Sequence, residues 1–210
     1  MKLLLAHGWG FDHAIWDDLV ARLPGWSIAV DDRGYFGAPR SPAIEGPCIA
    51  VTHSFGTMRV LAAPPPGLAG IVAINGFARF TAPAGQPGVP VRVVDHMLKR
   101  FAQDPRKVLA DFRRTCGSEA PFGEIDAAVL KADLLRLRDA RPPLPAVPVV
   151  SLQGAADPLL PEAMRAASFA GAREVRRMDV AQGGHLLPLE AADLCLRAIE
   201  GLASTLGAAA

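Results

Sequence analysis

The sequence predicts an α/β protein: a doubly wound, mostly parallel sheet with a small inserted helical unit. Short apolar segments of strand length alternate with helical patterns along most of the 210 residues. Such alternation is typical of a parallel sheet covered by helices on both faces. One stretch breaks the alternation, because residues 89–141 show only helical spacing after their first few positions. We therefore expect a core built from residues 1–88 and 142–210, with residues 89–141 inserted as a helical cap.

Six segments are expected to form strands. Most of them are apolar throughout, as is typical of strands that are buried on both faces of a sheet. Between residues 32 and 47 the chain is rich in Gly and Pro, which predicts a connection that is mostly loop. The expected strands span residues 2–6, 27–31, 48–52, 70–74, 147–152 and 174–179.

The helices are expected from apolar spacing and from signals at their ends. Asp12 is a typical N-cap, and apolar residues recur after it at helical spacing up to the Pro24-Gly25 stop. A helix that starts at Ser54 is expected to end before three consecutive prolines, and Pro161 suits the first turn of another helix. The expected helices span residues 13–23, 54–63, 161–170 and 187–206 in the core, and 91–103, 104–116 and 124–138 in the insertion.

Composition excludes several classes of protein. The chain has 22 Lys and Arg against 21 Asp and Glu, whereas a nucleic-acid binder carries a clear basic excess. No apolar run approaches the ~20 residues that span a bilayer, and the apolar start is shorter than the roughly 7–15 residues of a signal-peptide core. We therefore expect a cytoplasmic protein with neither membrane nor nucleic acid as a partner. Cys48, Cys116 and Cys195 lie far apart, so neither a zinc site nor a disulfide framework is expected.

Ser54 is the first candidate for catalysis. It follows an apolar strand and opens a helix, in the segment Thr52-His53-Ser54-Phe55-Gly56. A sharp strand-to-helix turn exposes a serine hydroxyl above the sheet edge, and it favours small residues two positions to either side of the serine. Gly56 meets this requirement, whereas Thr52 stands where a glycine is usual. The alternative is that Ser54 serves only as the N-cap of its helix.

Two further candidates follow later strands. Asp157 lies in a Gly-Ala-Ala-Asp-Pro segment, and His185 follows two glycines after the last expected strand. Taken alone, Asp157 is compatible with an ordinary turn and His185 with a solvated loop. Together, Ser54, Asp157 and His185 stand in the order of a hydrolytic triad, each at the carboxyl end of an expected strand. We expect a serine nucleophile, a histidine base and an orienting aspartate, with no metal or organic cofactor.

The segment His7-Gly8-Trp9-Gly10 follows the first expected strand and completes the predicted site. Acyl transfer needs N–H donors aimed at the developing oxyanion, and each is worth about 2.7–4 kcal/mol. The backbone N–H groups of Trp9 and Phe55 are the expected pair, because the glycines allow the loop to turn inward. His7 is expected to brace this loop by hydrogen bonds; the alternative, a zinc ligand, has no partner ligands nearby in the sequence.

These segments resemble the serine esterases of the α/β-hydrolase fold, in the order of that family and from residue 7 to residue 188. Within the superfamily the chain is similar to the carboxylesterases of biotin synthesis, which hydrolyse the methyl ester of pimeloyl-acyl carrier protein. The resemblance implies a reduced α/β-hydrolase fold, ester hydrolysis through an acyl-enzyme, and acyl carrier protein as a partner. It rests on the His7 loop with Phe11 and Trp16, the turn at residues 32–37, the Ser54 turn, the Ile74-Asn75-Gly76 strand end, the Thr115-Cys116-Gly117 helix end, and the Asp157 and His185 loops.

Substrate contacts are expected from two parts of the chain. Asn75 and Phe77 end a strand beside the strand that leads to Ser54, so they are expected to line the pocket together with Trp9. Phe101 and Phe112 belong to the insertion and are expected to line an acyl tunnel. The alternative for the two insertion residues is that they only seal the cap onto the sheet.

The insertion is locally basic. Residues 92–114 hold seven Lys and Arg against three Asp, whereas the whole chain has a net charge of +1. An acidic carrier protein would suit this surface, and an ordinary solvated helix face is the alternative. The residues expected to contact a carrier are Arg100, Arg106, Lys107, Arg113 and Arg114.

Three other functions remain open from the sequence. One is a generalist esterase for small soluble esters, and a second is another hydrolase of this fold, such as one that cleaves a C–C bond with the same triad. A third is a binding module that keeps the fold without catalysis. A haloalkane dehalogenase is disfavoured, because it would carry Asp at position 54.

Overall fold

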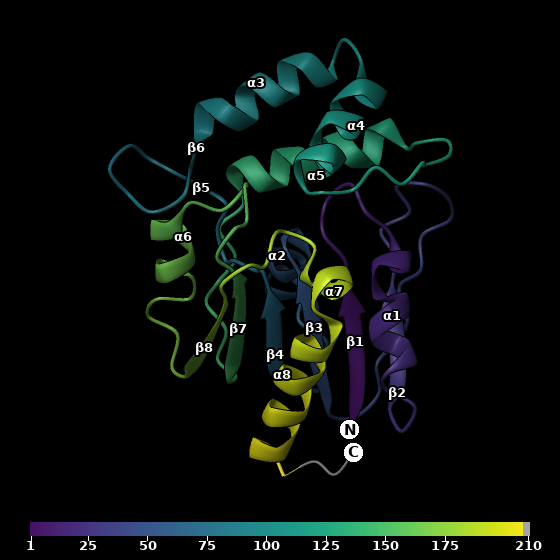
Figure 1. Ribbon diagram of the computed structural model, residues 1–210, viewed down its shortest axis with the longest axis vertical. Coiled ribbons are helices and arrows are strands. Elements are labelled where there is room, and N and C mark those ends of the chain that lie inside the picture. Colours follow the sequence, from purple (N-terminus) through teal and green to yellow (C-terminus); the bar gives the residue numbers. More distant parts are fainter. Residues whose placement is uncertain (208–210) are drawn as a thin grey trace.

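The computed structural model describes residues 1–207, and its centre is a six-stranded sheet (Figure 1). The strand order is β2-β1-β3-β4-β7-β8, and each neighbouring pair is parallel. This confirms the predicted doubly wound parallel sheet, although the last three residues of the expected core, 208–210, lie outside the described residues. The strands are β1 (Lys2–Ala6), β2 (Ser27–Asp31), β3 (Cys48–His53), β4 (Leu68–Ile74), β7 (Val149–Gly154) and β8 (Val175–Val180).

Helices cover both faces of this sheet. In Figure 1, α1, α7 and α8 lie in front of the strands and α2 lies behind them. The helix expected after Asp12 begins as a 3-10 turn, whose Ala14 N–H is capped by the Asp12 carboxylate at 3.0 Å. The core helices are η1 (His13–Trp16), α1 (Asp17–Ala21), α2 (Phe55–Ala62), α6 (Glu162–Ala167), α7 (Leu187–Glu190) and α8 (Ala192–Thr205).

The last expected helix is in fact two helices, because the chain turns at Ala191. The Glu190 carboxylate bends back to accept hydrogen bonds from the N–H groups of Gly184 at 2.6 Å and Leu186 at 3.0 Å. Ala191 has an extended φ of −147°, which ends α7. The apolar spacing continues across this break, so periodicity alone could not reveal it.

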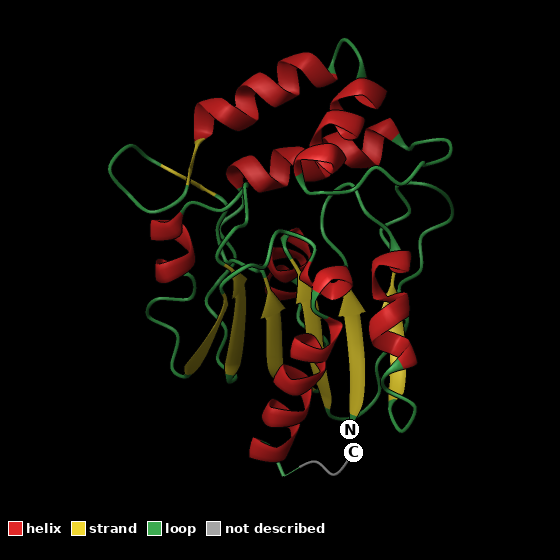
Figure 2. Cartoon of the chain, in the orientation of Figure 1, coloured by secondary structure: helices red, strands yellow, loops and turns green. Residues whose placement is uncertain are grey.

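Three helices lie beyond the carboxyl ends of the strands, toward which the arrows in Figure 2 point. They are α3 (Val91–Phe101), α4 (Pro105–Thr115) and α5 (Ala127–Asp139), close to the three helices expected in the insertion. Two short strands before them, β5 (Thr81–Ala82) and β6 (Val89–Pro90), pair in parallel and were not expected. Within residues 1–207, no helix is long and apolar enough to cross a membrane.

Separate apolar clusters hold these layers together. Leu3, Leu5 and Val51 of the sheet pack in one cluster with residues of α8. A second cluster lies where the loops at the strand ends meet α3, α4 and α5. Its fully buried members include Trp9, Tyr35, Phe55, Phe77, Phe101, Leu109 and Leu130. The candidate catalytic loops therefore lie under an apolar layer.

Gly56 is expected to be essential for stability, because α2 approaches β1 very closely at this position. A Cβ atom on Gly56 would lie 2.2 Å from the carbonyl oxygen of Ala6 and 2.7 Å from that of His7. Backbone atoms cannot swing aside, so we expect Gly56→Ala to lower the free energy of unfolding by about 3 kcal/mol or more. Urea denaturation measures this loss. Gly37→Ala is the matched control, because nothing lies within 4 Å of its Cβ position; equal stability of the two variants would contradict the close approach.

Candidate active site

Ser54 occupies a strained turn between β3 and α2. Its backbone has φ 52° and ψ −123°, which non-glycine residues rarely adopt. The side chain makes no capping hydrogen bond to the helix, which argues against the alternative that Ser54 is only an N-cap. Such strain is typical of a turn that holds a nucleophilic serine at a sheet edge.

The structure explains how Thr52 fits where a glycine is usual. The Thr52 hydroxyl lies 2.7 Å from the Thr57 hydroxyl, and it also approaches the Val72 carbonyl oxygen at 3.4 Å. Thr52 and Thr57 therefore pair beneath the turn, and both are fully buried. The close approach of α2 to β1 occurs at Gly56, on the other side of Ser54, so the turn tolerates the side chain of Thr52.

Asp157 and His185 form a buried pair. His185 Nδ1 lies 2.7 Å from Asp157 Oδ2, and both side chains are almost fully buried. The other carboxylate oxygen of Asp157 accepts hydrogen bonds from the N–H groups of Leu159 at 2.7 Å and Leu160 at 3.3 Å. With Nδ1 directed at Asp157, the lone pair of Nε2 is free to accept a proton. His185 Nε2 is buried and has no hydrogen-bond partner among residues 1–207.

His53 brings the end of β3 next to the His185 loop. The ring centres of His53 and His185 are 4.9 Å apart, and His53 Nε2 lies 2.9 Å from the His185 carbonyl oxygen. Burial, with His185 as a second cause, lowers the pKa of His53 well below its usual range, so His53 is neutral and donates through Nε2. In the described part of the chain, no hydrogen bond joins the Ser54 hydroxyl to His185. Catalytic hydrogen bonds are often long or poorly aligned in proteins without substrate.

Asn75 links the loops that carry Asp157 and His185. Its amide nitrogen donates to the carbonyl oxygens of Gly184 at 2.8 Å and His185 at 2.9 Å. Its amide oxygen accepts the N–H of Gly154 at 2.7 Å. The side chain was expected to bind substrate, but it is fully buried and both of its polar atoms are used. Asn75 is therefore a positioning residue in this structure.

The His7 loop lies directly against Ser54. A Cβ atom on Gly8 would lie 3.0 Å from the Ser54 Cβ. As expected, His7 braces the loop: Nδ1 donates to the Gly8 carbonyl at 2.8 Å, and Nε2 accepts the Arg33 N–H at 2.9 Å. Neither the backbone N–H of Trp9 nor that of Phe55 donates to another described residue. Both N–H groups are thus free for the expected role as oxyanion donors.

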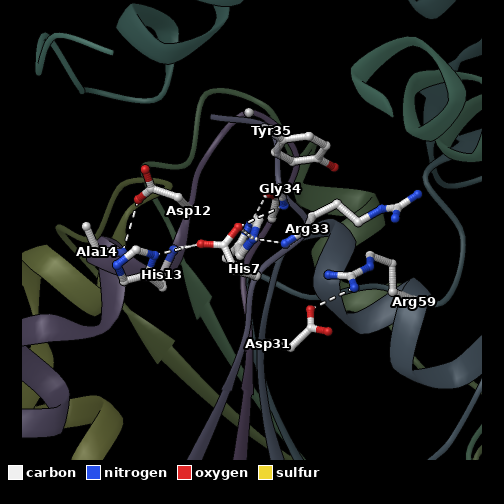
Figure 3. Close-up of polar contacts among 12 residues, drawn as sticks. His7, Asp12, His13, Ala14, Asp31, Arg33, Gly34, Tyr35 and Arg59 are labelled. Atoms are coloured by element: carbon white, nitrogen blue, oxygen red, sulfur yellow. Dashed lines mark hydrogen bonds and ion pairs between the residues drawn. The ribbon is translucent and has the colours of Figure 1, made fainter. Parts of the chain in front are cut away.

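Asp32 organises the neighbouring turn (Figure 3). His13 Nδ1 lies 2.6 Å from one of its oxygens, and the Gly34 N–H donates to the other at 2.8 Å. Burial opposes ionisation of this carboxyl. Nevertheless, the nearby His7 ring and the hydrogen bonds from Gly34 and His13 hold the pKa of Asp32 well below its usual range. The charged Asp32 therefore fixes the loops that flank the site.

Asp133 of α5 anchors the helices above the site to the core. Arg33 donates two hydrogen bonds to its carboxylate, at 2.5 and 3.1 Å, and the Tyr35 hydroxyl donates a third at 2.8 Å. Arg136 of the same helix also pairs with it at 2.5 Å. Burial opposes the charge, but these donors lower the pKa of Asp133 below its usual value. Sequence reasoning missed this anchor, because Asp133 lies in a helical pattern with other charged residues.

The anchor predicts a pH-dependent stability. Folding lowers the pKa of Asp133, so its ionised form stabilises the protein. This contribution to the free energy of unfolding is fully present above the pKa of the unfolded state, about 3.9, and is lost as pH falls through the pKa of the folded state. We expect Asp133→Asn to cost at least about 2 kcal/mol at pH 6, with a smaller difference from the wild type at pH 3. Urea denaturation at both values measures this. Asp139→Asn is the control, because its side chain is 63% exposed; a pH-independent difference for Asp133→Asn would contradict the anchor.

Trp9 and Arg113 make two further links between the helices and the His7 loop. The Trp9 indole N–H donates to the Leu130 carbonyl of α5 at 2.8 Å. Arg113 of α4 donates to the Gly10 carbonyl at 2.8 Å, and its guanidinium lies 4.8 Å from the Phe11 ring centre. Burial lowers the pKa of Arg113.

Arg113 therefore differs from its expected role as a carrier contact: it is only 7% exposed and clamps α4 to the loop. Periodicity alone could not distinguish it from its exposed neighbour Arg114.

The other basic residues of the insertion are only partly free. Arg100 and Arg114 both pair with Asp111, at 2.6 and 3.2 Å. Arg106 donates to backbone carbonyls and lies over the Phe122 ring, while Lys107 is exposed. The exposed basic surface is therefore smaller than the sequence suggests.

The expected aromatic contacts surround the loop. Phe112 packs edge-on against Trp9 with ring centres 4.8 Å apart, and Phe101 lies 6.3 Å from Trp9. Phe77 lines a cavity of about 470 Å³ together with Met164 and Phe169. Ser54 itself is 7% exposed. The aromatic layer thus covers the site.

Comparisons with known proteins agree with this fold. No family model matches the chain. The chain is 27% identical over 198 residues to a pimeloyl-[acyl-carrier protein] methyl ester esterase from Pectobacterium carotovorum subsp. carotovorum (strain PC1), covering 76% of this chain and 77% of that protein.

Solved structures of similar fold include an esterase from Exiguobacterium antarcticum, with a TM-score of 0.77, 18% identity, and coverage of 99% of this chain and 92% of that one. A hydrolase from Oleispira antarctica gives a TM-score of 0.75, 14% identity, and coverage of 97% and 90%. Both the sequence relative and these structures are hydrolases, which supports the expected class of enzyme, a carboxylic ester hydrolase. The chain therefore has the α/β-hydrolase fold, and it is similar in sequence to a methyl ester esterase of pimeloyl-acyl carrier protein.

Proposed function

We propose that the chain is a serine carboxylesterase in which Ser54 is the nucleophile, His185 the base and Asp157 the residue that orients it. The observation that carries this proposal is the buried His185–Asp157 pair with a free Nε2, beside a serine in a strained turn. Strained serine turns and buried Asp–His pairs each arise in other contexts, but their meeting at one sheet edge favours hydrolysis.

The proposed reaction has two stages. Ser54 Oγ attacks the ester carbonyl carbon while His185 Nε2 takes the hydroxyl proton, and the Trp9 and Phe55 N–H groups bind the oxyanion. His185 then gives the proton to the leaving alcohol as the C–O bond breaks, which leaves an acyl-enzyme. Water, deprotonated by His185, attacks the acyl carbon, and the proton returns to Ser54 as the acid leaves. These steps need only the side chains and N–H groups of the chain.

More specifically, we propose that the substrate is the methyl ester of pimeloyl-acyl carrier protein and that the enzyme acts in biotin synthesis. The sequence similarity to an esterase of that name supports it. In this proposal residues 89–141 form the cap, Phe77, Phe101 and Phe112 border the acyl chain, and the exposed Lys107 and Arg114 face the acidic carrier. A generalist esterase for small esters is the second candidate, because Arg113 is buried and Asp111 offsets two of the other arginines.

A charge-reversal experiment separates the two candidates. We expect Lys107→Glu/Arg114→Glu to lower kcat/KM for the carrier-bound methyl ester about tenfold, and to change kcat/KM for a free p-nitrophenyl ester less than about twofold. Arg173→Glu is the control. That arginine is exposed and precedes the N-terminal end of β8, whereas the candidate site lies at the carboxyl ends of the strands. An equal response of both substrates would reject the carrier and favour the generalist.

A further inference from the structure

The connection from β2 to β3 leaves one face of the sheet partly uncovered. As expected from its composition, residues 32–47 contain no helix. A crossover between parallel strands usually lays a helix on the sheet. Here a groove of about 500 Å³ lies beside α2, over β1 and the end of β2. None of the candidate catalytic residues borders this groove.

The groove has an apolar floor and a charged rim. The floor consists of aliphatic side chains: Leu4 and Ala6 from β1, Val60 and Ala62 from α2, and Ala63, which follows α2. The rim carries three arginines from three separate elements: Arg33 from the loop after β2, Arg59 from α2 and Arg136 from α5. Asp31 and Ser41 complete it. Such a lining suits a molecule with an apolar body and a negatively charged head.

The arginines at the rim exceed the carboxylates that neutralise them. Arg59 pairs with Asp31 at 2.7 Å, whereas Arg33 and Arg136 share the single carboxylate of Asp133. Three guanidinium groups therefore face two carboxylates, which leaves one positive charge uncompensated. Figure 3 shows Arg59 directed toward Asp31, with the guanidinium of Arg33 on the same side.

Arg59 also carries an unpaired donor. Its Nη1 atom is buried and has no hydrogen-bond partner among the described residues. A buried donor without a partner is rare in folded proteins and calls for an explanation, such as a bound ion or ligand. Guanidinium groups also bind carboxylate and phosphate through paired N–H donors, more specifically than an ammonium group does.

We infer that this groove is a second binding site, for a small organic anion whose carboxylate or phosphate head lies at Arg59 and whose short apolar body lies on Leu4, Ala6 and Val60. Arg59 pairs with Asp31 through Nη2, but its Nη1 has no hydrogen-bond partner among the described residues, so we take it as the main contact. Arg33 and Arg136, which share the carboxylate of Asp133, supply the uncompensated charge. The site is separate from the ester-hydrolysing centre, so it does not depend on the proposed catalytic function.

Ligand titration by NMR tests this site, with arginine Nε–H and methyl signals recorded at constant ionic strength. The probes are phenyl phosphate, hexanoate and inorganic phosphate. We expect phenyl phosphate or hexanoate to saturate and to shift the signals of Arg59 and Leu4. Inorganic phosphate is expected to bind at least about fivefold more weakly, because it lacks the apolar body. The better of the two organic probes then identifies the head group.

Variants decide whether Arg59 is the contact. We expect Arg59→Gln to weaken binding at least about fivefold. Arg40→Gln, at an exposed position in the connection from β2 to β3, is expected to leave binding unchanged. The double variant Asp31→Asn/Arg59→Gln avoids an unpaired carboxylate and is expected to bind as weakly as Arg59→Gln. The inference is overturned if no probe saturates, if the affinity survives Arg59→Gln, or if inorganic phosphate binds as tightly as the organic anions.

Discussion

His185→Ala is expected to lower kcat for ester hydrolysis by at least about 10⁴-fold with little change in KM, because the base that activates Ser54 is lost. Asp157→Asn is expected to lower kcat by a similar order, since an amide would favour the wrong tautomer of His185. Stopped-flow or steady-state assays with a p-nitrophenyl ester measure both effects. The oxyanion donors and substrate binding would remain, so some activity above that of water is expected to persist.

The loss of kcat should be specific to the His185–Asp157 pair. His96→Ala removes an exposed histidine of α3 and is expected to leave kcat unchanged. The double variant His185→Ala/Asp157→Asn is expected to be scarcely slower than His185→Ala, because residues that act as a unit are not additive. If His185→Ala retained a tenth of the wild-type kcat, the base would have to be another residue.

Asn75→Asp is expected to lower kcat about 10²-fold, because displacement of a catalytic group by about 1 Å costs this much. The substitution keeps the size of the side chain, but it removes the donor that binds the carbonyl oxygens of Gly184 and His185. It also directs a carboxylate at these oxygens. Asn75→Gly is the companion variant, since glycine relieves the positive φ of 45° and removes the whole side chain without adding a charge.

A general loss of stability must be distinguished from a displaced His185 loop. Thr81→Val removes two other partly buried hydrogen bonds away from the His185 loop, from Thr81 to the Arg138 carbonyl and from Arg141 to Thr81. It is expected to reduce the free energy of unfolding by about 1–2 kcal/mol and to leave kcat unchanged. If both Asn75 variants were as active as Thr81→Val, Asn75 would have only a structural role.

The sheet was predictable because its four central strands, β1, β3, β4 and β7, are buried on both faces and are therefore mostly apolar. β1 and β2 begin and end at the expected residues, and the other strands differ from expectation by one to two residues at their ends. The break at Ala191 was not predictable, since the contact of Glu190 with Gly184 and Leu186 depends on the tertiary fold. β5 and β6 were missed because strands of two residues are too short to show a pattern of alternating or continuous apolar residues.

The candidate site was only partly predictable. The chain order of Ser54, Asp157 and His185 was informative, because the carboxyl ends of parallel strands meet at one sheet edge. The roles of Asn75 and His53 required the structure, since both act on the His185 carbonyl from another strand. Burial also separates Arg113 from Arg114, although sequence treats these neighbours alike.

Covalent labelling with a fluorophosphonate tests the central claim most directly. At neutral pH the wild type is expected to gain one adduct, which peptide mass spectrometry assigns to Ser54. The adduct should be absent in Ser54→Ala and should form at least about 10³-fold more slowly in His185→Ala. A folded wild type that takes up no label, or an adduct that persists in Ser54→Ala, would contradict the assignment of Ser54 as the activated nucleophile.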